Sequence, residues 1–564
     1  MRTRRFLIAL PLVLALALSA CGAGGASQDS EAAPDVAPAE EVATSTAAVL
    51  PDEVYQAVDA QLFPGPEGAY VGDVMPFVTK DGQLELYYLY DTSHNGQGYH
   101  PIYKYSTLDL SGYEDHGMML NNGQGSDADP ALGTGSVMQD KDGVYHLFYT
   151  GHNDTGNAGR GKECVMHASS TDRENWVKDG EPLFFAPDGY DKDDFRDPEV
   201  FRVEEEQCYW LLMSARTEEL EGVVVKYTST DLKNWEFVGP IFAPLNEYMC
   251  ECPDLFKIGD YWYLTYSWDC VTYYAKSDSM YGPFVPPRDN ILDGKGLMSG
   301  NGFIFYAAKT AQVDDHVYLC GWIGQAGLSA DSGMYQWAGN VLVHEIVQHE
   351  DGTLGVKAPE VLDDYFTVDK PFNAAAVTDG VSIDGNNITL SANEGVFALA
   401  DMGTRPASMT LECDVMLDEH GLAGFAFGGS GSDENWTVLC LDGRRDQLHY
   451  EGGYITDIAM TEPMAVTRFN FDRSSTHHVK LVCENDVVVM YVDDVKCLSS
   501  RISHGTNGAH IGVFSEGSGA TFSNITISVP AEAVRHRTPI GTKGRQERSC
   551  RSYFRERPDR KRIS

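Results

Sequence analysis

Three carboxylates recur at one spacing in the sequence. Five segments each contain an extended apolar stretch, a turn and a second stretch rich in Tyr, Phe and Leu. Asp73 stands eight residues before the Asp81-Gly82 turn of the first segment; Asp197 and Glu251 stand eight residues before the turns of the third and fourth, and Thr134 holds this place in the second. Equivalent positions on repeated strands are expected at one height. The three acids are therefore predicted to converge, and clustered like charges are costly without a function.

A pair of carboxylates in different surroundings can break a glycosidic bond. One protonates the leaving oxygen, and the other attacks the sugar or activates a water. A third acid can stabilise an oxocarbenium-like sugar. Arg196, next to Asp197 in the sequence, is placed to hydrogen-bond one of the acids and fix its geometry.

The repeated segments predict the elements that position these residues. Asp81-Gly82 and Asp142-Gly143 are strong hairpin turns. Ser170 to Trp176 resembles Ser229 to Trp235, and Trp176 and Trp235 are expected to pack an outer strand onto the next blade. Repeats of about 50 to 60 residues with four short strands each are typical of propeller blades. We expect a five-bladed β-propeller over residues 51–365, with hairpins at 72–90, 132–150, 197–214, 251–267 and 302–321.

The pattern changes after about Tyr365. Met409 to Met416 alternates in polarity, Val487 to Val492 is continuously apolar, and the strand pattern ends near Val529. This patterning predicts a β-sandwich over residues 366–530. The expected fold class is therefore all-β, a five-bladed propeller followed by a C-terminal β-sandwich.

Both ends of the chain differ from its body. Three arginines precede a short apolar run at residues 6–18, and Leu18-Ser19-Ala20-Cys21 resembles a bacterial lipobox. Residues 1–21 are expected to be a lipoprotein-type signal with lipidation at Cys21, the alternative being an ordinary secretion signal. Residues 22–50 predict a disordered tether and 531–564 a basic, disordered tail. The protein is thus expected to be exported, with membrane contact only through the N-terminal lipid.

Composition excludes several partners. The 564 residues carry 42 Lys+Arg against 83 Asp+Glu, a net charge of -41, which disfavours nucleic acid. Cys and His spacing matches no zinc site, and neither a phosphate-binding glycine loop nor a dinucleotide fingerprint is present. No metal or cofactor is expected, and the oligomeric state is not determined by the sequence.

Two motifs resemble those of a known family. Phe195-Arg196-Asp197-Pro198 and Glu251-Cys252-Pro253-Asp254 resemble signatures of glycoside hydrolase family 32, the β-fructosidases, and Phe305-Tyr306-Ala307 and Gly321-Trp322 resemble its later motifs. The resemblance covers about residues 70–530. It implies hydrolysis of a fructoside of the sucrose, inulin or levan type.

The resemblance also implies roles for single residues. Asp73 would be the nucleophile that forms a covalent fructosyl-enzyme, Glu251 the general acid and then base, and Asp197 the stabiliser of the transition state. Thr134-Gly135-Ser136 resembles a segment that lines the sugar pocket. Substrate contacts are expected from Arg196, Thr134, Ser136, Met75 and Cys252.

The segment around Asp73 departs from the family. Members show Trp-Met-Asn-Asp-Pro-Asn-Gly, whereas this chain has Tyr70-Val71-Gly72-Asp73-Val74-Met75-Pro76. The acid is kept, but the tryptophan and both asparagines are not. Sucrose or inulin therefore does not follow from the resemblance alone.

Other functions fit parts of the pattern. A family 43-type arabinofuranosidase or xylosidase would invert configuration, with its two carboxyl groups about 6.5 to 9.5 Å apart rather than about 5 to 5.5 Å. A surface lipoprotein that binds glycans without cleaving them, and a fructosyltransferase, are further alternatives. Turnover of a fructoside, lost in Asp73→Asn, separates an enzyme from a binding protein.

Overall fold

A computed structural model describes residues 57–531 except 97, 246, 297–301, 419, 429–435, 456–462, 473–474 and 503–509. The signal, Cys21, the tether to residue 50 and the tail after 531 lie outside these residues, so those predictions stay predictions. The described residues contain three short 3-10 helices: η1 (Asn157–Gly159), η2 (Gly327–Ser329) and η3 (Glu360–Asp364). None of the described helices has the length and apolar character needed to cross a membrane. The predicted all-β class is confirmed.

All five predicted hairpins are present, and each is antiparallel. They are β1 (Tyr70–Val78) with β2 (Leu84–Asp91), β5 (Ala131–Gln139) with β6 (Tyr145–His152), β10 (Tyr190–Val203) with β11 (Cys208–Thr217), β14 (Glu251–Ile258) with β15 (Tyr261–Trp268), and β18 (Tyr306–Val313) with β19 (His316–Ala326).

Outer strands extend each hairpin into a sheet. They are β3 (Ile102–Thr107), β4 (Glu114–Leu120), β7 (Glu163–Ser170), β8 (Val177–Lys178), β9 (Phe184–Phe185), β12 (Gly222–Ser229), β13 (Glu236–Phe242), β16 (Val271–Ser277), β20 (Tyr335–Gln348) and β21 (Leu354–Lys357). The sheet of β14 has three strands where four were predicted. In place of a fourth strand, β16 makes two isolated bridges, Lys276 with Val285 and Tyr273 with Ile291. Pro283, Pro286 and Pro287 around Val285 lack the N–H that a strand donates.

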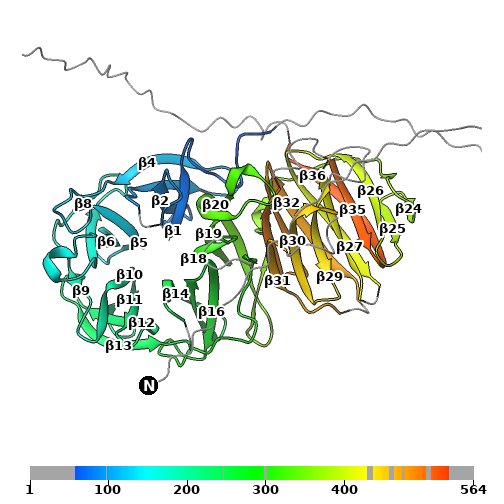
Figure 1. The fold of residues 1–564 in the computed structure, drawn as a ribbon. Coiled ribbons are helices and arrows are strands. Elements are labelled where there is room, and N and C mark those ends of the chain that lie inside the picture. Colours follow the sequence, from blue (N-terminus) through cyan, green and yellow to red (C-terminus); the bar gives the residue numbers. More distant parts are fainter. Residues whose placement is uncertain are drawn as a thin grey trace, which may run out of the picture. The chain divides into compact units, whose positions relative to one another are not determined.

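The first strands of the five hairpins surround a common centre (Figure 1). β1 contacts β5, β5 contacts β10, β10 contacts β14, β14 contacts β18, and β18 contacts β1. A pairing of Val71 with Gly339 joins β1 to β20, so the first and fifth hairpins share one sheet.

A buried ion pair crosses this centre. Lys309 of β18 lies with Nζ 2.8 Å from Glu199 Oε2 of β10 and donates to the carbonyl of Gly135 on β5 at 2.7 Å. Burial raises the pKa of Glu199 to about 7, although the charge of Lys309 opposes the shift. Only glycine fits at position 135, because a Cβ there would lie 1.7 Å from the carbonyl oxygen of Phe148. Lys309 thus links three inner strands.

The repeated tryptophans pack between sheets, as predicted, but in the opposite direction. Trp176 meets Tyr87 edge-on at 5.9 Å between ring centroids, and Trp235 meets Phe148 at 5.8 Å. Each indole therefore contacts the preceding sheet rather than the next one.

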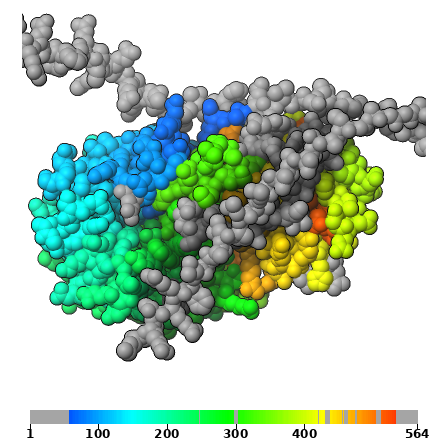
Figure 2. All heavy atoms as spheres, in the orientation of Figure 1, coloured from blue at the N-terminus to red at the C-terminus, as the bar shows by residue number. Residues whose placement is uncertain are grey.

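The C-terminal strands form two further sheets whose strand order is β17-β31-β30-β29-β28-β35-β26-β23 and β24-β25-β36-β27-β32-β33-β34, with β22 on β36. Phe425 of one sheet packs edge-on against Phe522 of the other, with centroids 5.8 Å apart. Figure 2 shows the surface, with blue to green atoms over the five hairpins and yellow-green to red atoms over these two sheets. The strands are β17 (Lys295–Gly296), β22 (Val368–Asp369), β23 (Ala375–Ala376), β24 (Val381–Asp384), β25 (Asn387–Ser391), β26 (Phe397–Thr404), β27 (Ser408–Leu417), β28 (Leu422–Gly428), β29 (Trp436–Asp442), β30 (Gln447–Tyr454), β31 (Ala465–Arg468), β32 (His477–Glu484), β33 (Val487–Val492), β34 (Lys496–Arg501), β35 (His510–Glu516) and β36 (Gly519–Val529).

Removing the central cation should destabilise the fold. Lys309→Met leaves Glu199 buried without its partner, and breaking a buried pair in this way costs about 3 to 5 kcal/mol. Chemical denaturation of both proteins at pH 8 measures the difference. Lys141→Met, at an exposed pair with Asp142, is the control and should unfold like the wild type. Equal stability of Lys309→Met and wild type would show that the pair does not hold the ring together.

Candidate active site

A cavity of about 300 Å³ collects at least one side chain from each inner strand. Asp73 comes from β1, Thr134 from β5, Asp197 from β10, Glu251 from β14 and Tyr306 from β18. The structure therefore brings the three predicted acids together, with Arg196 also in the wall.

A break in strand register explains why these side chains point into one space. Every inner strand has such a break, between Val71 and Val74, Gly133 and Gly135, Arg196 and Glu199, Glu251 and Asp254, and Tyr306 and Lys309. A bulge re-aims the side chains beside it. Asp197 itself has a φ of 65°, and Cys252 and Ala307 in the neighbouring strands have φ of 50° and 53°. The hairpin turns differ in length. Counting eight residues back from each turn therefore locates the break in each strand, but not the same paired position in every hairpin.

Both oxygens of Asp73 accept a hydrogen bond. Thr134 Oγ1 donates to Oδ2 at 2.6 Å, and Trp322 Nε1 donates to Oδ1 at 3.0 Å. Burial raises the pKa of Asp73, whereas these two hydrogen bonds and the charges of His100 and Lys309 act to lower it. The carboxylate is thereby fixed in orientation at the cavity wall.

Glu251 is held from two sides. Arg196 Nε lies 3.2 Å from Oε1, and the hydroxyl of Tyr306 donates to Oε2 at 2.5 Å. Burial raises the pKa of Glu251; Arg196 and Tyr306 lower it, and the charge of Asp73 raises it again. The net shift is upward, which extends the pH range in which the carboxyl holds its proton.

Asp197 is the most buried of the three acids, with 3% of its surface exposed. The amide of Cys252 donates to its Oδ2 at 2.9 Å, and its own amide donates to Thr150 Oγ1 at 2.8 Å. Burial and the charge of Glu251 raise the pKa of Asp197, while Arg196 opposes the shift.

Arg196 links the acids to two further carboxylates. Its Nη1 donates to both oxygens of Glu163 at 2.7 and 2.8 Å, and its Nη2 donates to Asp194 at 2.7 Å. Burial alone would raise the pKa of Glu163, but the charge of Arg196 and the hydrogen bond with His152 outweigh it and lower the pKa. Glu163 therefore stays charged and fixes the guanidinium against Glu251.

Three of the predicted substrate contacts lie away from the cavity wall. Met75, Ser136 and Cys252 are buried and lie outside the residues that line the cavity. Met75 packs in the apolar core, and Ser136 bonds the backbone of β10 at Pro198 and Val200. Successive side chains of a strand point alternately into the cavity and away from it, and a bulge shifts this alternation. The position of a residue in a sequence motif therefore does not determine which way its side chain points.

Several wall residues were not predicted as part of the site. Tyr306 lies eight residues before Asp314, so the same count could have found it. Trp337 and Glu163 carry no such signal. The indole of Trp337 fills the space above Gly72, where a Cβ would lie 2.4 Å from its Cη2. Trp337 thus explains why glycine stands where the family motif has asparagine.

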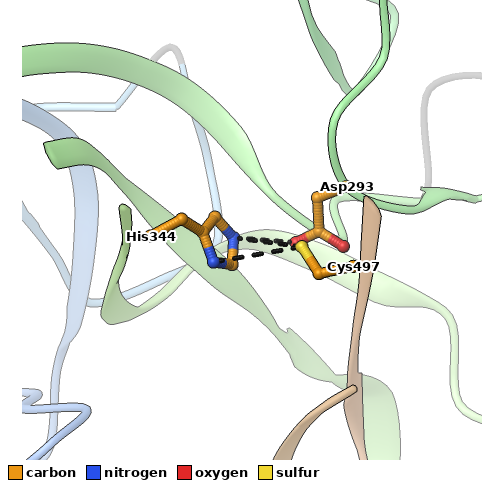
Figure 3. A group of neighbouring side chains, drawn as sticks. All are labelled: Asp293, His344 and Cys497. Atoms are coloured by element: carbon orange, nitrogen blue, oxygen red, sulfur yellow. Dashed lines mark hydrogen bonds and ion pairs between the residues drawn. The ribbon is translucent and has the colours of Figure 1, made fainter. Parts of the chain in front are cut away.

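A second cluster of metal-binding residue types lies away from the cavity. Figure 3 shows Asp293, His344 and Cys497 pointing toward one another. The carboxylate of Asp293 is 3.1 Å from His344 Nε2 and also accepts the amide and hydroxyl of Ser499. Burial raises the pKa of Cys497 well above its usual range, and a metal would need the thiolate. The cluster is better explained as a hydrogen-bond network that joins β20 to β34.

The profile described as "Glycosyl hydrolases family 32 N-terminal domain" matches residues 65–357, the region that supplies all of the cavity residues named above. The chain belongs to this family. The predicted resemblance is confirmed at this level.

Curated relatives are distant in sequence. The raffinose invertase of Escherichia coli is 26% identical over 302 residues, which cover 51% of this chain and 62% of the relative. A sucrose-6-phosphate hydrolase of Vibrio alginolyticus is 26% identical over 291 residues, 49% of this chain and 58% of the relative. The chain thus matches less than two thirds of the length of these relatives.

Solved structures share the fold over a longer span. An exo-inulinase from Aspergillus awamori aligns with a TM-score of 0.65 and 18% identity, covering 84% of this chain and 99% of the inulinase. A sucrose-6-phosphate hydrolase from Lactobacillus gasseri aligns with a TM-score of 0.63 and 16% identity, covering 84% and 93%. At these identities the likeness shows the fold alone.

Because the pKa of Asp197 is raised in the folded protein, Asp197 should make folding stability depend on pH. A carboxyl whose pKa is raised by folding binds protons more tightly in the native state, so the native state loses stability as the pH rises from the unfolded pKa through the folded one. Asp197→Asn removes this loss. The variant should be more stable than wild type at pH 8, by on the order of 1 kcal/mol, and the difference should vanish toward pH 4.

Thermal unfolding at the two pH values tests this expectation. Asp260→Asn, in an exposed hairpin turn, is the matched control and should show no such pH dependence. A variant at Asp197 that is less stable than wild type at pH 8 would contradict the electrostatic explanation.

Proposed function

We propose that this protein is a retaining glycoside hydrolase that cleaves β-fructofuranosidic bonds through a covalent fructosyl-enzyme. The observation that supports it most is the pair Asp73 and Glu251 at one cavity, each held by a different set of donors. The family assignment and the names of the relatives, an invertase and sucrose-6-phosphate hydrolases, favour a fructoside of the sucrose type.

In the proposed first step, Asp73 attacks the anomeric carbon. Its two oxygens are oriented by Thr134 and Trp322, so one lone pair is directed without a change of rotamer. Glu251, whose pKa is raised by burial, transfers its proton to the leaving oxygen. The products are the alcohol and a fructosyl ester of Asp73.

In the proposed second step, water replaces the alcohol. Glu251, now ionised, takes a proton from the water as it attacks the same carbon, and Asp73 leaves as a carboxylate. Asp197 accepts hydrogen bonds from the sugar hydroxyls while positive charge develops on the ring. Arg196 steadies Glu251 in both protonation states.

The finer features of the architecture are part of this proposal. The closed order of contacts among β1, β5, β10, β14 and β18 supports a five-bladed propeller, and the two facing sheets after it support a β-sandwich. The lipobox-like residues at Cys21 support export with a lipid anchor at the cell surface.

Loss of either acid should abolish turnover. Asp73→Asn and Glu251→Gln should each reduce fructose release from sucrose at least about 10³-fold, because one removes the nucleophile and the other the proton donor. Sucrose, raffinose, inulin, levan and aryl arabinosides are tested in parallel. Asp315→Asn, in an exposed turn, is the control.

Release of arabinose without fructose would instead support the inverting alternative. Binding of sugars with no release of product would support the lectin alternative. Either result would reject the proposed activity.

The hydroxyl of Tyr306 should set the alkaline limit of activity. It lowers the pKa of Glu251 by donating a hydrogen bond to the charged form, so Tyr306→Phe should raise that pKa. The first step needs protonated Glu251, so the alkaline limb of kcat/KM should move to higher pH, by up to about 1 unit. Tyr263→Phe, which removes a buried hydroxyl bonded to Gly352, is the control. A limb that stays in place, or moves to lower pH, would contradict the assigned acid.

A further inference from the structure

The hairpin turn beside Glu251 has an unfavourable backbone. Trp268 pairs with Val271, leaving Asp269 and Cys270 as a two-residue loop. Their φ values are 49° and 67°, as in a type I′ turn, which normally selects Asn and Gly. Trp268, Asp269 and Cys270 all line the cavity. Strained turns of this kind persist where the residues serve a function.

Trp268 is the last member of a rigid stack. Its ring lies 5.3 Å from that of Tyr248 at an interplanar angle of 27°. The guanidinium of Arg216 lies 4.4 Å from the centre of the Tyr248 ring and is held by Asp191 and Asp194 at 2.5 Å each. The indole is therefore fixed before any ligand arrives, which lowers the entropic cost of binding.

The stack stands on the side of the proposed proton donor. Glu251 is the first residue of β14 and pairs with Ser267, so Trp268 is the next residue along the partner strand. Tyr248 precedes Glu251 by three residues. A general acid lies beside the leaving oxygen. Trp268 and Asp269 therefore line the cavity on the side where the leaving sugar would lie.

Charge restricts which sugar this place accepts. The described residues of the cavity wall include five carboxylates, on Asp73, Glu163, Asp197, Glu251 and Asp269, against one permanent cation, Arg196. Arg196 is already bonded to Glu163, Asp194 and Glu251. A phosphate beside Asp269 would meet repulsion without a free cation among the described wall residues.

We propose that Trp268 and Asp269 form a leaving-group subsite for a neutral sugar ring. The indole stacks on the apolar face of the ring and the carboxylate of Asp269 accepts hydrogen bonds from its hydroxyls. This assignment rests on the proposed fructosidase activity and deepens it. It selects sucrose over sucrose 6-phosphate, whose phosphate is carried by the leaving glucose.

Kinetics with three substrates test the subsite. Sucrose and sucrose 6-phosphate have a sugar as leaving group, whereas methyl β-D-fructofuranoside releases only methanol. Trp268→Ala should lower kcat/KM for sucrose by roughly 10-fold or more, with methyl fructoside changed by less than about 3-fold. Trp268→Phe should restore most of the sucrose activity. The wild type should prefer sucrose to its 6-phosphate by roughly 10-fold or more, and Asp269→Asn should narrow that preference.

Control measurements distinguish a failure of the leaving-group subsite from a failure of the fructosidase activity. Tyr281→Ala removes an exposed aromatic ring away from the cavity (57% exposed) and should change neither substrate. An equal loss on sucrose and methyl fructoside in Trp268→Ala, no loss on either, or a wild-type preference for sucrose 6-phosphate would overturn the subsite. A wild type that cleaves no fructoside at all would instead reject the fructosidase activity itself.

Discussion

The site depends on keeping three carboxylates together in one cavity although they repel one another when charged. Burial raises the pKa values of Asp73, Asp197 and Glu251, and the charges of neighbouring acids add to the rise at Asp197 and Glu251. Arg196 supplies the compensating positive charge: it contacts Glu251 directly and is itself held in place by Glu163. Neutral donors complete the arrangement at each acid. Asp73 and Glu251 therefore stand in different surroundings, as a pair of nucleophile and acid requires.

The backbone also holds the three acids close together. Each inner strand carries a bulge at the level of the cavity, and a residue with positive φ stands in three of them. Below the cavity, the ion pair of Lys309 and Glu199 joins strands of different hairpins. The acids are therefore mounted on a ring of strands that is crosslinked through its centre, which limits how far they can move apart.

Much of this could be predicted from the sequence, for identifiable reasons. Asp-Gly turns and aromatic strands repeat visibly, so the five hairpins and the convergence of Asp73, Asp197 and Glu251 follow from counting. The count succeeded because bulges absorb differences in turn length. The direction of Met75, Ser136 and Cys252 could not be predicted, because a bulge alters the alternation of side chains. Trp337 and Glu163 come from segments whose distance along the chain conceals their proximity to Gly72 and Arg196.

In the proposed mechanism, Asp73 forms a covalent bond to the sugar and Glu251 donates a proton to the leaving group. Cleavage of sucrose in the presence of methanol tests it most directly, with NMR of the methyl fructoside formed at early times. Two displacements at one carbon predict methyl β-D-fructofuranoside alone. Formation of the α-anomer would contradict the covalent mechanism, because a single displacement inverts the anomeric carbon.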